Sequence, residues 1–202
     1  MLNHVYDGIQ IALDLFNRST VRIVWNLFLA FIPLTLSFYL FHPSAIRNFI
    51  WWTSLLIFIA FLPNAPYILT DSIHIIELSQ NYPIWATILV LIPQYILFIV
   101  AGFEAYAICL TKLDNYLSLF FNPRQIFLIE IIIHASCVVG IYIGRFERFN
   151  SWDILTRPQV VMQTTIKDLL VPQQLLTMAI ALVLIWLLSE LVQLVNSQIG
   201  HR

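Results

Sequence analysis

Long stretches without a charged side chain constrain this chain more than any other feature of its sequence. No Asp, Glu, Lys or Arg occurs in residues 23–46, 48–70, 78–103 or 169–189. A helix of about 20 residues crosses a hydrocarbon core of roughly 30 Å. Because backbone polar groups in lipid must be satisfied within the segment, each run predicts a transmembrane helix.

A fifth run, near residues 125–144, is apolar except for Glu130 and His134. Only 10% of the residues are charged, against about a quarter in soluble domains. We therefore expect an all-α, polytopic integral membrane helical bundle that forms a single domain over residues 1–202. The five expected spans lie near residues 24–41, 46–62, 84–108, 125–144 and 174–196.

Residues 1–22 come before the first expected span and place apolar side chains at helical spacing. This pattern is typical of an amphipathic helix at the membrane surface, and residues 71–80 and 160–170 show it too. With five spans, the N-terminal segment and the loops near 63–83 and 145–173 lie on one side. That side carries six Arg and Lys residues and the other side four, which favours a cytoplasmic N-terminus.

The second expected span ends in two prolines, Pro63 and Pro66, that flank Asn64 and Ala65. Each proline lacks a backbone donor, so the sequence predicts a break in the helix and irregular backbone. Such backbone is tolerated at this depth where protein buries it or where it meets a water-filled cavity. Asn64 is interpreted either as part of a polar pocket or as a local cap of a helix that turns along the interface.

Asp71, His74 and Glu77 follow directly, and their spacing by three places them on one face of a helix. Two carboxylates and an imidazole can bind a divalent cation or carry out acid–base chemistry. They can equally form a solvated face. The spacing matches no stringent metal motif, so these residues are only weak candidates for metal ligands.

A second polar cluster follows the fourth expected span, in which Gly140 and Gly144 allow another helix to approach closely. Its guanidinium and amide groups can bind a phosphate or carboxylate, such as a lipid headgroup. Alternatively, the arginines anchor the helix end and one of them pairs with Asp71. The cluster consists of Arg145, Arg148, Asn150, Trp152 and Asp153.

The stretches FLPNAPYILTD, GIYIGR and RFNSWD together resemble an uncharacterised family of bacterial membrane proteins, called domain of unknown function thirteen sixty-one. The resemblance extends from about residue 25 to 196. It implies a polytopic protein of the bacterial inner membrane, and it brings no established activity, substrate or catalytic residue. The chain departs from the family pattern at Glu104, where the resemblance predicts a small uncharged stretch. The resemblance implies a working surface that includes Asn64, Asp71, Arg145, Asn150, Trp152 and Asp153.

We expect a binding or accessory membrane protein whose polar pocket is formed by the loops 63–80 and 145–158. An alternative is an enzyme that uses His74 with Asp71 or Asp153 on a lipid-linked substrate. Neither a catalytic residue nor a cofactor can be named from the sequence. Expected partners are membrane lipid, and also a partner protein or a second copy of the chain. The net charge of −1 provides no basic stripe for nucleic acid.

Ionisable side chains within the expected spans suggest a third function, an oligomeric ion or proton transporter. The groups concerned are Glu104, Glu130 and His134. Glu130 and His134 are four residues apart, so they can instead neutralise each other on one helix face. The absence of matching sequence halves argues against a transporter built from repeats.

Overall fold

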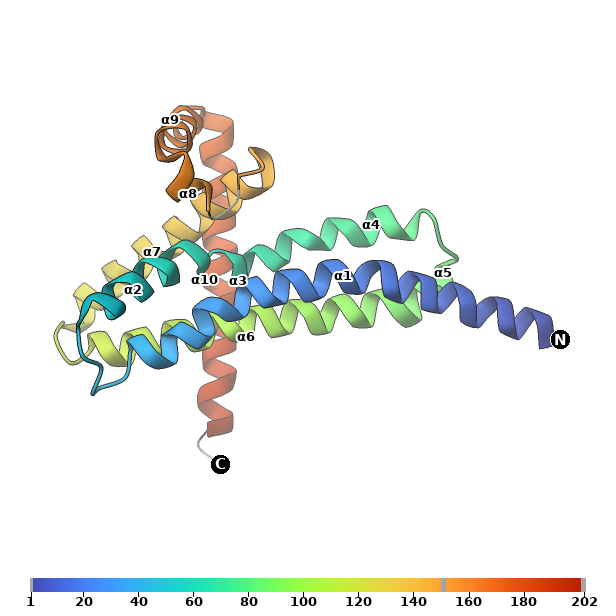
Figure 1. Ribbon diagram of the computed structural model, residues 1–202, viewed down its shortest axis with the longest axis horizontal. Coiled ribbons are helices and arrows are strands. Elements are labelled where there is room, and N and C mark those ends of the chain that lie inside the picture. The colour runs from blue at the N-terminus through green and yellow to red at the C-terminus, as the bar shows by residue number, and fades with distance from the viewer. Residues whose placement is uncertain (1, 150–151, 201–202) are drawn as a thin grey trace.

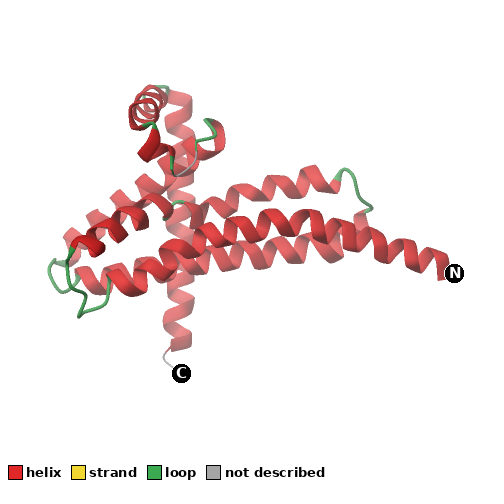
Figure 2. Cartoon of the chain, in the orientation of Figure 1, coloured by secondary structure: helices red, strands yellow, loops and turns green. Residues whose placement is uncertain are grey.

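The computed structural model describes residues 2–149 and 152–200, which are helical and contain no strand (Figures 1 and 2). This confirms the all-α fold. Five helical runs in these residues are long and apolar enough to cross a membrane, as the charge-free runs predicted. They are Tyr6–Leu40, Phe49–Ser79, Ile84–Leu117, Pro123–Phe146 and Pro172–Gln198.

The first run belongs to α1 (Leu2–Leu40), a continuous helix of 39 residues. It is about 58 Å long at 1.5 Å per residue, roughly twice the thickness of a hydrocarbon core. The N-terminal segment and the first expected span are thus parts of one rod. The amide of Gln94 fixes this rod to the third run, because it accepts a hydrogen bond from Ser19 (2.6 Å) and donates one to Thr20 (2.9 Å).

Nearer the N-terminus, the Tyr82 hydroxyl donates a hydrogen bond to Asp14 of α1. Desolvation and this hydrogen bond raise the pKa of Tyr82 above its ordinary value. The phenol therefore remains protonated at neutral pH and keeps its role as a donor.

The second run is interrupted as an α-helix at Leu62 and Pro63, where the sequence predicted a break. It comprises α2 (Phe49–Phe61), α3 (Asn64–Tyr67), the 3-10 turn η1 (Ile68–Ser72) and α4 (Ile73–Ser79). Leu62 and Pro63 form a turn that keeps right-handed dihedrals, with φ of −53° and −59°. A proline ring fixes φ near the helical value, and a hydrogen bond from the Ala65 N–H to the Leu62 carbonyl, three residues back (3.2 Å), closes the turn.

The third run lies alongside α1 (Figure 1). Its main helix, α6, packs against α1, α3, α7 and α10 and contributes the fully buried Tyr95, Phe98 and Tyr106. The capping box of Asn122 and Gln125 starts the next helix, α7. The bounds are α5 (Ile84–Ala86), the π turn η2 (Thr87–Leu91), α6 (Ile92–Leu117) and α7 (Pro123–Phe146).

Three helices complete the chain: α8 (Asp153–Thr156), α9 (Pro158–Leu169) and α10 (Pro172–Gly200). In Figure 1, α10 runs across the other long helices, and it packs on α6, α7 and α9. Most of its apolar side chains are exposed, as in Leu176 and Leu191. Such a surface suits contact with lipid tails.

The predicted pair between Glu130 and His134 is wrong. The His134 ring nitrogen Nδ1 lies 2.9 Å from the hydroxyl of Tyr106 on α6. The Glu130 carboxyl instead faces Asp114, also on α6. Each side chain therefore finds a partner on the neighbouring helix, a possibility that spacing within one helix does not reveal.

Candidate binding site

A cavity of about 320 Å³ lies where α1, α2, α3 and α7 meet, and the segment after α7 and α9 complete its wall. The lining thus comes from parts of the chain that are far apart in sequence. α3 packs against both α1 and α7, so it forms the base between these two helices. The cavity adjoins residues 24, 62 and 144, where the sequence predicted span boundaries. In the structure only the last of these lies near the end of a helical run, because Tyr6–Leu40 and Phe49–Ser79 continue beyond the cavity.

A glycine contact sets how closely α7 approaches α3. A Cβ atom added to Gly140 would lie 2.9 Å from Cβ and Cγ of Pro63, closer than real Cβ contacts. At Gly144 the nearest atoms, in Tyr67 and Phe149, would be 3.6 Å away, which is ordinary contact. The close approach that the sequence predicted therefore depends on Gly140, while Gly144 has room for a methyl group.

Three polar side chains line the cavity: Asn26 from α1, Asn64 from α3 and Arg148 after α7. The side-chain amide of Asn64 donates to the Phe61 carbonyl (2.9 Å), so it serves a backbone group of the proline segment as expected. Arg148 has a left-handed backbone with φ of 57°, which is uncommon for a residue other than glycine. Within residues 2–149 and 152–200, no carboxylate lies within ion-pair distance of its guanidinium.

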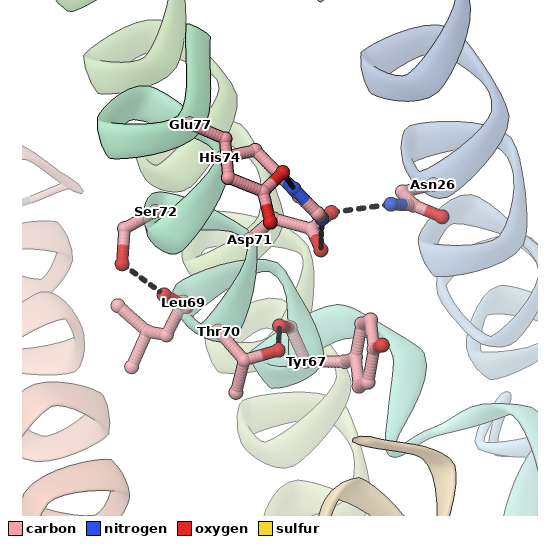
Figure 3. Close-up of polar contacts among 8 residues, drawn as sticks. All are labelled: Asn26, Tyr67, Leu69, Thr70, Asp71, Ser72, His74 and Glu77. Atoms are coloured by element: carbon pink, nitrogen blue, oxygen red, sulfur yellow. Dashed lines mark hydrogen bonds and ion pairs between the residues drawn. The ribbon is translucent and has the colours of Figure 1, made fainter. Parts of the chain in front are cut away.

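A buried carboxylate, Asp71, lies beside this wall (Figure 3). Asp71 is 2% exposed and accepts a hydrogen bond from the amide of Asn26. His74 continues the array, with Nε2 3.9 Å from Asp71 and Nδ1 2.6 Å from the Glu77 carboxylate. The contacts confirm that Asp71, His74 and Glu77 share one face, and Asn26 joins this face to the cavity.

The ion pair expected between an arginine and Asp71 does not form in the described part of the chain. Asn26 provides the donor instead, and Arg145 and Arg22 act on Asp71 only through longer-range attraction. An amide carries no charge, so its pairing with Asp71 could not be predicted from charge patterns.

The geometry around His74 favours a hydrogen-bonded array over a metal site. Its Nδ1 atom is occupied by the bond to Glu77. Among the residues that the structure describes, no group of three or more His, Cys, Asp and Glu side chains could hold a metal ion.

The residues predicted from sequence fall into three groups. Asn64, Arg148 and Trp152 line the cavity, while the array that begins at Asp71 lies behind Asn26. The buried Asp153 begins α8 and binds the guanidinium of Arg157 at 2.6 Å.

Arg145 lies in the last turn of α7 with a half-buried side chain, and it is not among the residues that line the cavity. Asn150 lies outside the described residues.

Sequence reasoning missed several lining residues, among them Trp25, Asn26 and Tyr67. Trp25 and Tyr67 are aromatic residues in a highly aromatic chain, so their types carry no signal. Asn26 does carry a signal in the sequence, because it is a lone amide at the start of a charge-free run and such a group needs a partner in lipid.

The helical fold and its five apolar runs define the class: this chain is an integral, multi-pass membrane protein. A family model described as "Protein of unknown function (DUF1361)" matches residues 25–188, and the chain therefore belongs to this family. The match includes every residue that lines the cavity. No matching protein was found among curated proteins or among solved structures.

Proposed function

We propose that the protein is a membrane-embedded binding protein whose cavity holds an anionic group, a phosphate or a carboxylate. The observation that carries the proposal is the convergence of Asn64 and Arg148, which are far apart in sequence, on one cavity of about 320 Å³. A cavity of this size is at the lower end of the range for small-molecule sites. We place the protein in the inner membrane of a bacterium, as its motifs imply.

The chemistry of the lining supports an anion. The guanidinium of Arg148 faces no carboxylate at ion-pair distance among the described residues, so its charge is available to a ligand. Guanidinium groups bind phosphate and carboxylate through charge-assisted hydrogen bonds. Trp25 and Trp152 flank the site, and tryptophan is enriched at membrane interfaces, where lipid headgroups lie.

The enzyme alternative has less support, because its proposed base does not reach the cavity. His74 is not among the lining residues, and Asn26 stands between the cavity and Asp71. The Asp153 carboxylate binds Arg157. The array around Asp71 is better explained as support for the cavity wall.

The transporter alternative also has less support. Glu104 accepts a hydrogen bond from Asn196 of α10 at 2.7 Å, and His134 bonds to Tyr106. Such local pairs between neighbouring helices satisfy buried polar groups and hold the bundle together.

The test compares two variants that each remove one positive charge, at opposite ends of α7. Arg148→Gln removes the cation of the cavity, whereas Arg124→Gln removes an exposed cation at the opposite end of α7. We expect Arg148→Gln to weaken binding of inorganic phosphate or phosphatidic acid about tenfold or more, measured by equilibrium dialysis in detergent. Equal affinities in both variants would contradict the proposal.

A further inference from the structure

The polarity of the cavity changes steadily along its length, and from this we infer that its ligand is a phosphate-bearing lipid with its hydrocarbon chain directed into the bundle. The inference rests on the function proposed above and names the class of the ligand. A soluble anion and a lipid headgroup present the same phosphate to Arg148. They differ in what the other end of the cavity must accommodate.

The change in polarity is clearest along α7. Gly140 and Ile143 line the cavity inside the helix, and Arg148 lines it just after the helix ends. The helix rises by about 9 Å from Gly140 to its end at Phe146, and Arg148 lies two residues further along the chain. The cation therefore lies at one end of the cavity, and the apolar atoms of Gly140 and Ile143 lie toward the other end.

The helices α1 and α2 repeat this order although they run in opposite directions. On α1, Asn26 lies at the polar end of the cavity and Leu29 lies about one turn further along it. On the second run, Asn64 lies at the polar end and Ala60 lies about one turn away from it. Three separate segments change from polar to apolar residues in the same direction. The change in polarity is therefore a property of the cavity and not of one helix.

The rim of the cavity is open at the protein surface. Trp25 and Trp152 both line it, yet they keep 53% and 49% of their surface exposed. α3 contacts both α1 and α7. We expect a lipid to enter the cavity through this exposed rim.

The end of the cavity opposite Arg148 is lined by apolar residues. Ala60 and Gly140 face it, together with the half-buried Leu29. A volume of about 320 Å³ holds a phosphate headgroup and the first methylene groups of a chain. The rest of the hydrocarbon chain remains in the bilayer, so its conformational freedom is not lost on binding to the protein.

A chain-length series on the wild-type protein tests the inference without any variant. Monomeric lysophosphatidic acids of increasing chain length should bind about fourfold more tightly for each methylene group buried, until the cavity is filled. Beyond that length the affinity should level off. Inorganic phosphate and glycerol 3-phosphate, measured alongside, should bind far more weakly than the longest lipids.

Two variants then test where in the cavity the hydrocarbon chain of the lipid lies. Ala60→Leu fills the apolar end of the cavity and should weaken the long-chain lipid about tenfold while leaving the affinity for inorganic phosphate unchanged. Ile59→Phe is the control, because Ile59 is exposed on α2 and does not line the cavity. Thermal melting of each variant shows whether it is folded.

The outcomes separate this inference from the proposed function. If phosphate and lipids of all lengths bind equally and all depend on Arg148, the cavity takes a soluble anion and the inference is overturned. If no probe depends on Arg148, the proposed function fails as well. Affinity that rises with chain length and then levels off, together with Arg148 dependence, supports both.

Discussion

Asn26 is the residue on which two features of the site depend. It lines the cavity, and its amide is the donor that the buried carboxylate of Asp71 accepts. A buried acceptor that loses its donor costs about 1–3 kcal/mol, and more when it is charged. The two residues lie 45 positions apart in sequence, so this pairing is a tertiary contact between α1 and the second run.

We predict that Asn26→Leu lowers the free energy of unfolding by about 2 kcal/mol or more, measured by thermal melting in detergent. The double variant Asn26→Leu with Asp71→Leu should recover much of this loss, because replacing both polar partners leaves no orphaned group. Asn115→Leu, at an exposed position of α6, serves as the control. A loss no larger than that of the control would show that the Asn26–Asp71 bond is not important to stability.

Arg148 combines an unfavourable backbone with the side chain to which we assign anion binding. A left-handed conformation costs a residue with a Cβ on the order of 1–3 kcal/mol, whereas glycine adopts it freely. We predict that Arg148→Gly unfolds at the same or a higher temperature than the wild type, yet loses phosphate binding. A clear fall in melting temperature would mean that the arginine stabilises the fold and is not retained for a ligand.

At the scale of elements, the contact between α7 and α3 sets the width of the cavity. Gly140 and Gly144 both line the cavity, but only at Gly140 would a methyl group clash with Pro63. Glycine pairs of this spacing are visible in sequence, which is why the close approach could be predicted. Which of the two glycines is in contact depends on the partner helix, and the sequence does not show that.

We predict that Gly140→Ala destabilises the protein by about 1–3 kcal/mol, the usual cost of inserting a methyl group into a packed contact. Gly144→Ala should be neutral or slightly stabilising, because alanine favours helix and the nearest atoms are 3.6 Å away. Thermal melting of both variants in one detergent provides the comparison. Similar melting temperatures would contradict the close approach of α7 to Pro63.

The proline segment shows how far reasoning about elements reaches. Pro63 and Pro66 remove donors, and from this the sequence predicted a break, which the structure has at Leu62 and Pro63, between α2 and α3. The chain after the break is regular, because α3, the 3-10 turn η1 and α4 continue through Ser79. Hydrogen bonds between residues three apart, such as that from Ala65 to Leu62, close these turns, and the residue types alone do not specify them.

At the scale of the whole molecule, the number of apolar helices follows from physics that the sequence makes visible. A run without charges must form a helix in lipid, and each of the five expected spans overlaps one observed helical run. Their lengths were less predictable. α1 continues as one helix from Leu2, since nothing at residues 20–24 ends it.

The site could be predicted in part for a related reason. Asn64, Arg148 and Trp152 follow the ends of the second and fourth expected spans. Two crossings separate these ends and place them on one side, so the convergence of the three residues on one cavity was foreseeable. The contribution of α1 to the cavity could not be predicted. Which helices lie side by side depends on packing between segments far apart in sequence, and Asn26 enters the site only through that packing.

The most direct test of the central claim is solid-state NMR of the protein in bilayers, with recoupling between ³¹P of the lipid and ¹⁵N of the arginine side chains. We predict a contact between phosphate and guanidinium in the wild type and in Arg124→Gln. The same contact should be lost in Arg148→Gln. A phosphate contact that survives Arg148→Gln undiminished would contradict the account, because the cavity would then not be where the lipid binds.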